Sequence, residues 1–213
     1  VCLWAPEVLY HYHPCHLIHP VCCSFLYSPA FRRIRAGSTY RNTGGVISYV
    51  QEAFNHPTYG QLGYDGDISV VKLIEPLVYT PVVQQAIIAA PNTILSDNLL
   101  VVLAGWGTTT SLICGTSSSV LLDTTIFTIN RELCAERYLA LPDSGMVTEN
   151  MICAGLLNVG GRDACQGDFG GPLNYGNIVV GVASWGHGCG NETYPGVSTA
   201  VWPYTDWIIA TAV

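Results

Sequence analysis

The sequence predicts an all-β fold of antiparallel strands, and three observations support this class. Short runs rich in β-branched and aromatic residues recur between turn residues along most of the chain. Of the 213 residues, 22 are glycine and 12 are proline, and only 11% are charged, which suits a turn-rich globular fold and argues against disorder. The runs do not alternate with long amphipathic helices, so an antiparallel β-barrel is favoured over a parallel sheet, with a sandwich as the alternative.

The expected elements begin near Arg32. Strands are predicted, in chain order, over residues 44–51, 67–74, 99–106, 177–185 and 196–201. A short helix is expected after Asn130, whose side chain is a good N-terminal cap. A second helix is predicted at the C-terminus, where Val201, Tyr204, Trp207 and Ile208 share one apolar face.

The first thirty residues follow neither the helical nor the strand period. Four histidines and three cysteines lie between His11 and Cys23, and five of these side chains could form a zinc site: His11, His13, Cys15, His16 and Cys22. An irregular, partly oxidised segment is the alternative. A third interpretation is that residues 11–25 are read in the wrong frame, since codon degeneracy permits a string in another frame that ends in Ala-Ala-His.

Charge and cysteine content narrow the class of protein. The formal net charge of −7 argues against nucleic acid or an anionic membrane as the main partner. The chain has no run of about eighteen uncharged apolar residues, so no transmembrane helix is predicted. Nine cysteines outside any CxxC pair favour a secreted protein with disulfides, and the odd count leaves one thiol unpaired or intermolecular. The first ten residues lack the basic start of a signal peptide.

One motif carries most of the functional information. Residues 160–173 read GGRDACQGDFGGPL, and residues 183–190 read ASWGHGCG. Further matches are NHPTYG at 55–60, DGDISVVKL at 65–73, AGWG at 104–107, MICAG at 151–155 and YPGVSTAV at 194–201. In this order the motifs resemble the trypsin-like serine proteases, most closely the digestive trypsins of insects.

The resemblance implies two antiparallel six-stranded β-barrels with a short C-terminal helix. The implied organisation is an atypical segment at 1–30, the remainder of an N-terminal barrel at 31–90, a C-terminal barrel at 91–200 and the helix at 201–213. Because the match stops near Phe31, the first barrel is expected to be incomplete. The resemblance also implies a monomer without a cofactor or metal.

The resemblance implies catalytic roles that this chain meets only in part. Phe169 stands where the family has its serine nucleophile, and a benzyl group has no hydroxyl or thiol to deprotonate. The backbone N–H groups of Gly167 and Phe169 match the oxyanion hole. Asp168 matches the aspartate that pairs with the N-terminal amine of the mature enzyme, whose sequence of the Ile-Val-Gly-Gly type is replaced here by Val1-Cys2-Leu3-Trp4. Asp67 matches the aspartate that orients the catalytic histidine.

The histidine base has no match. The family carries it in an Ala-Ala-His-Cys run upstream of Arg32, and neither His16 nor His19 fits that run. His56 and His187 fall in segments that match non-catalytic loops, so we expect them to be structural or surface residues. The chain is therefore expected to be inactive as a peptidase.

The specificity pocket is better matched than the catalytic groups. Asp163 matches the acid that binds Lys or Arg side chains at the pocket base, and four residues match its walls and rim: Ser184, Trp185, Gly186 and Gly196. The resemblance also implies two disulfides, Cys134–Cys153 and Cys165–Cys189. The expected partner is a peptide, protein substrate or inhibitor with Lys or Arg. The alternatives to an inactive endopeptidase homologue are a pseudoprotease that binds a basic peptide, inhibitor or immune partner, and a decayed or mis-translated copy of an active digestive trypsin.

Overall fold

The computed structural model describes residues 32–109, 116–142 and 144–212. Its N-terminal part is a three-stranded antiparallel sheet in the order β1 (Arg33–Ala36), β2 (Val46–Asn55) and β3 (Ser69–Leu73). Along β2, Ser48 and Val50 are buried and Tyr49 between them is exposed, the alternation expected of a strand with one covered face. The sheet therefore packs on one side and meets solvent on the other.

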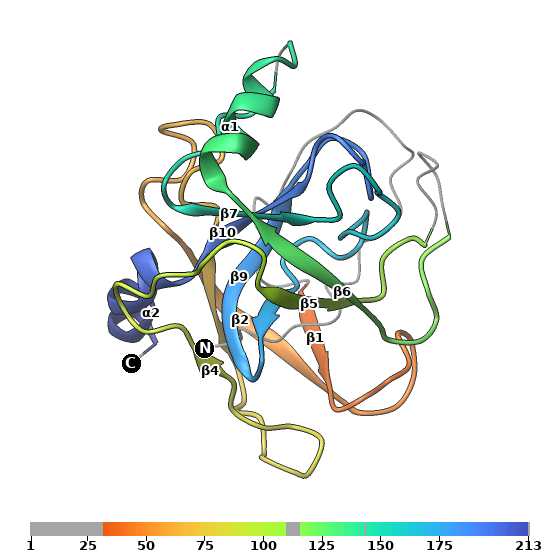
Figure 1. Ribbon diagram of the computed structural model, residues 1–213. Coiled ribbons are helices and arrows are strands. Elements are labelled where there is room, and N and C mark those ends of the chain that lie inside the picture. Colours follow the sequence, from red (N-terminus) through yellow and green to blue (C-terminus); the bar gives the residue numbers. More distant parts are fainter. Residues whose placement is uncertain (1–31, 110–115, 143, 213) are drawn as a thin grey trace.

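The C-terminal part is a closed six-stranded barrel (Figure 1). Its strands are β5 (Leu100–Gly105), β6 (Leu122–Ile129), β7 (Met151–Gly155), β8 (Pro172–Tyr175), β9 (Ile178–Trp185) and β10 (Gly196–Ala200). They pair in the order β10-β7-β6-β5-β8-β9, and the antiparallel pairing of β9 with β10 closes the ring, which leaves no open edge among the six. The two-residue strand β4 (Ile87–Ile88) adds to β9 in parallel.

The barrel contains the main hydrophobic core. Val101, Leu173 and Val180, from three different strands, are each at most 1% exposed. Two residues from the N-terminal part, Ile68 and Val70, belong to the same core. The end of the three-stranded sheet that carries β3 is thus packed onto the barrel.

Two helices lie outside the barrel. Helix α1 (Arg131–Leu139) begins at Asn130, whose Oδ1 accepts the N–H of Leu133 at 3.0 Å, so the predicted cap is confirmed. The chain ends in a 3-10 turn, η2 (Trp202–Tyr204), and helix α2 (Thr205–Thr211), which buries Ile208. No helix in the described ranges is long and apolar enough to cross a membrane.

The predicted all-β class, the barrel and the short C-terminal helix are confirmed, whereas the second six-stranded barrel is not. Residues 32–80 form only the three strands of one sheet. Strand β4 falls within the expected N-terminal unit but pairs with β9 of the barrel. The interpretations of residues 1–30 as a zinc site, an irregular segment or a misread segment lie outside the described residues.

Candidate functional site

The Gly167–Gly171 loop holds Phe169 in a fixed backbone position. Gly167 and Gly170 have φ values of 98° and 86°, which side-chain-bearing residues rarely adopt. The N–H of Gly170 donates to the carbonyl of Ala183 on β9 at 2.8 Å, and the N–H of Gly171 donates to the carbonyl of Asp168 at 2.8 Å. Within the described chain, the N–H groups of Gly167 and Phe169 have no hydrogen-bond partner.

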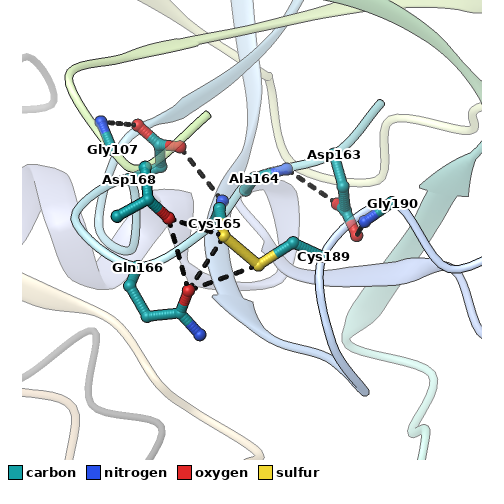
Figure 2. Close-up of a disulfide and its surroundings, with 9 residues drawn as sticks. Gly107, Asp163, Ala164, Cys165, Gln166, Asp168, Cys189 and Gly190 are labelled. Atoms are coloured by element: carbon teal, nitrogen blue, oxygen red, sulfur yellow. Dashed lines mark hydrogen bonds between the residues drawn. A yellow bond between two sulfur atoms is a disulfide. The ribbon is translucent and has the colours of Figure 1, made fainter. Parts of the chain in front are cut away.

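The carboxylate of Asp168 anchors this loop to the turn after β5 (Figure 2). One oxygen accepts the N–H of Gly107 at 2.7 Å, and the other accepts the N–H of Cys165 at 3.0 Å. Burial raises the pKa of Asp168, and the two N–H bonds oppose that shift. A side chain at position 107 would collide with this carboxylate, because a Cβ there would lie 2.3 Å from Oδ2.

Both disulfides that the resemblance implies are present. Cys165–Cys189 joins the loop that carries Phe169 to the segment after β9 (Figure 2). Cys134–Cys153 joins α1 to β7. The Cys165–Cys189 bridge therefore holds together the segment that contains Asp163 and the segment that contains Gly190.

Asp163 lines a small cavity. Its carboxylate accepts the N–H of Ala164 at 2.8 Å and the N–H of Gly190 at 3.2 Å (Figure 2). Burial raises the pKa of Asp163 to about 7, although both N–H bonds favour the ionised form. Gly196 lies so close that a Cβ there would be 2.2 Å from Oδ1.

The cavity brings together most of the residues singled out in the sequence. Phe169, Asp163, Ser184, Trp185, Gly186 and Gly196 all line it. Its volume is about 10 Å³, which is room for about one water molecule. The pocket residues therefore converge as the resemblance implies, but little open space is left between them.

Asp67 is connected to this cavity through Ser184. Asp67 is fully buried just before β3, and its Oδ2 accepts the Oγ–H of Ser184 on β9 at 2.6 Å. Its backbone carbonyl accepts the Oγ–H of Thr199 on β10 at 2.9 Å. The aspartate of the N-terminal part is thus attached to two strands of the barrel, beside the cavity that contains Phe169.

Comparison with known proteins gives the family. A family profile described as Trypsin matches residues 26–208 of the chain. The chain belongs to the trypsin family. It is 42% identical to Trypsin, alkaline C, of Manduca sexta over 83% of this chain and 67% of that protein. It is 43% identical to Trypsin CFT-1 of Choristoneura fumiferana over 84% of this chain and 69% of that protein.

The fold of this chain is also similar to a solved protein structure. Neuropsin, a serine protease expressed in the limbic system of mouse brain, superimposes with a TM-score of 0.76 at 28% sequence identity. The match covers 85% of this chain and 79% of neuropsin. The closed barrel and the three-stranded sheet are therefore arranged as in a serine protease.

The two described histidines of this trypsin-family chain have structural surroundings. His56 Nδ1 is hydrogen-bonded to Thr58 Oγ1 at 2.8 Å, and its ring packs edge-on against Tyr204 and Trp207 at 4.7 and 4.8 Å. Burial lowers the pKa of His56. The ring of His187 packs against Tyr194 at 5.1 Å. His16 and His19 lie outside the described residues.

Two residues that serve the site were missed by sequence reasoning. Gly107 donates to Asp168, and Thr199 donates to Asp67. Both fall in quoted motifs, AGWG and YPGVSTAV, so the signal was present. Their roles depend on pairings between residues 61 and 132 positions apart, which the motifs alone do not give.

Proposed function

We propose that this trypsin-family chain does not hydrolyse peptide bonds and retains the recognition pocket of a protease that cuts after Lys or Arg. The observation that carries the proposal is Phe169 at the nucleophile position of the Gly167–Gly171 loop. A benzyl group has no proton to lose and no lone pair with which to attack a carbonyl, so no acyl-enzyme can form there.

The neighbouring hydroxyl is unsuited to replace the missing nucleophile. Ser184 lines the same cavity but is 1% exposed, and its Oγ–H donates to Asp67 Oδ2. A nucleophilic serine needs a base that accepts its proton and an open approach to the substrate carbonyl. Ser184 fails the second condition, because its hydroxyl is buried and turned towards Asp67.

A second candidate function, binding of a basic side chain without cleavage, is favoured by Asp163. A buried carboxylate that is oriented by two backbone N–H groups and has glycines beside it suits an ammonium, guanidinium or amidine group. The two disulfides favour an oxidising, extracellular location. In this second candidate function, the chain is an extracellular pseudoprotease derived from a digestive trypsin.

Hydrolysis of an arginine p-nitroanilide tests the proposal. The purified chain is compared with an active trypsin and with the Asp67→Ala and Phe169→Ser variants. Because removing the nucleophile of a serine protease costs roughly a millionfold in kcat, we expect no turnover above the Asp67→Ala background. Phe169→Ser is also expected to stay inactive, since the chain has no Ala-Ala-His-Cys run to supply the base. Turnover by the unmodified chain that is lost in Asp67→Ala would refute the proposal.

A further inference from the structure

We propose that the ring of Phe169 gates the Asp163 pocket, so that a cationic side chain or amidine enters only when the ring turns out. This inference deepens the proposed function and rests on it, because it concerns access to the same recognition pocket. The chain would then be self-blocked: the residue that removes catalysis would also restrict binding.

The first argument is the space that remains. Phe169 is half-buried and lines the cavity that also has Asp163 at its wall. With Phe169 in this position, the cavity of about 10 Å³ admits a water molecule but not a planar guanidinium or amidine group. In the observed conformation, therefore, the pocket cannot hold the ligand for which Asp163 is suited.

The second argument concerns which part can move. The backbone beside Phe169 is held by the Gly170–Ala183 hydrogen bond, by the two hydrogen bonds of Asp168 and by the Cys165–Cys189 disulfide. A side chain that leaves its rotamer needs no change in these bonds. Opening is therefore a rotation of the Phe169 ring, while the loop stays in place.

The third argument is that the described residues supply no positive charge to the Asp163 carboxylate. In the structure as described, the partners of the Asp163 carboxylate are the N–H groups of Ala164 and Gly190. The ionisable group that shifts its pKa is Asp168, which is an acid and not a cation. Because burial holds the pKa of Asp163 near 7, a bound cation should ionise this carboxyl group and release a proton near neutral pH.

Calorimetric titration with benzamidine tests the gate. The unmodified chain is compared with Phe169→Leu, Phe169→Ala and the double variant Phe169→Ala/Asp163→Asn. Turning a half-buried phenyl ring out into water is expected to weaken binding by about 10-fold, so affinity should rise by about that factor in Phe169→Ala. Phe169→Leu should lie between the two, and the double variant should lose the gain. Phe127→Ala, which truncates a 41% exposed phenylalanine on β6, is the matched control and should bind like the unmodified chain.

Titrations in two buffers of different ionisation enthalpy add a readout for Asp163. Phe169→Ala should release part of a proton on binding near pH 7, and the double variant should not. Equal affinity of the unmodified chain and Phe169→Ala would refute the gate, and so would absence of binding by a folded Phe169→Ala. The proposal that the chain is inactive is tested separately: hydrolysis of the arginine p-nitroanilide by the unmodified chain would refute it.

Discussion

Replacing Asp163 by asparagine should stabilise the chain at neutral and alkaline pH. The pKa of Asp163 is raised from 3.8 to about 7, because burial disfavours the charged form. Between these two values the folded state keeps a proton that the unfolded state has lost, so the stability of the chain falls as the pH rises. Above pH 7 the loss is complete. Asparagine does not titrate, so the variant avoids the loss while its side-chain oxygen can still accept the N–H of Ala164.

The size of the effect follows from the width of that window. A difference of about three pH units corresponds to about 4 kcal/mol, which is an upper figure because the Asp163 side chain lines a cavity that water can enter. The advantage of Asp163→Asn should therefore be close to zero at pH 4, grow through pH 5 and 6, and reach about 2–4 kcal/mol at pH 8.

Urea denaturation at each pH measures this difference from the transition midpoints. Asp123→Asn, an exposed aspartate on β6, is the matched control, and its effect should stay within about 0.5 kcal/mol at every pH. A free-energy difference for Asp163→Asn that does not change between pH 4 and 8 would refute the assignment of a raised pKa to this carboxyl group.

Three further predictions concern the fold around the site, each measured by urea denaturation. Gly107→Ala should lower the free energy of unfolding by about 2–4 kcal/mol, because the new Cβ displaces Asp168 from its two N–H donors. Gly186→Ala is the control and should change the free energy of unfolding little, because the nearest atom to its new Cβ lies at 3.6 Å. Equal effects of the two variants would contradict the close-contact argument. Asn130→Ala should cost about 1 kcal/mol through loss of the α1 cap, and Asn130→Ser should recover most of it; no recovery would argue against capping. Leu173→Ala should lower the free energy of unfolding by about 2–5 kcal/mol, and Leu100→Ala by about 0.5 kcal/mol, because Leu173 is fully buried and Leu100 is 53% exposed. Similar losses in the two variants would place Leu173 outside the core.

The sequence predicted the elements that carry their own local signal. The runs at 99–106, 177–185 and 196–201 became β5, β9 and β10, since each combines several Val, Leu, Ile or Ala residues, some of which the barrel buries. Strand β6 was not predicted: its threonines at 124, 125 and 128 dilute the apolar pattern. Strand β8 is four residues long and begins with a proline. Short or polar strands are specified by their neighbours, here β5, β7 and β9, and not by their own composition.

The motifs predicted which residues form the site, but not that the pocket between them would be so small. The resemblance placed Asp163, Phe169 and Ser184 in one site, and these side chains do line one cavity. The small volume of that cavity depends on how side chains from strands far apart in the sequence pack together, which no local sequence pattern predicts. The second six-stranded barrel that the resemblance implies is not confirmed, and the sequence itself indicated an incomplete first barrel because the match stops near Phe31. Family membership predicts a complete set of strands, whereas the described N-terminal residues supply three.

Strand β3 takes part in two cores of unequal size. Ile68, just before the strand, and Val70 join the barrel interior, while Val71 packs with Ile34 and Val50 in a separate, smaller cluster that three partly buried residues flank: Ala53, Leu73 and Leu77. The free energy for local opening should therefore decrease from β3 towards β1, and amide hydrogens of β1 should exchange before those next to Asp67. A protease added to the native chain should therefore cleave near β1 more readily than around Asp67 and the pocket, which the barrel protects.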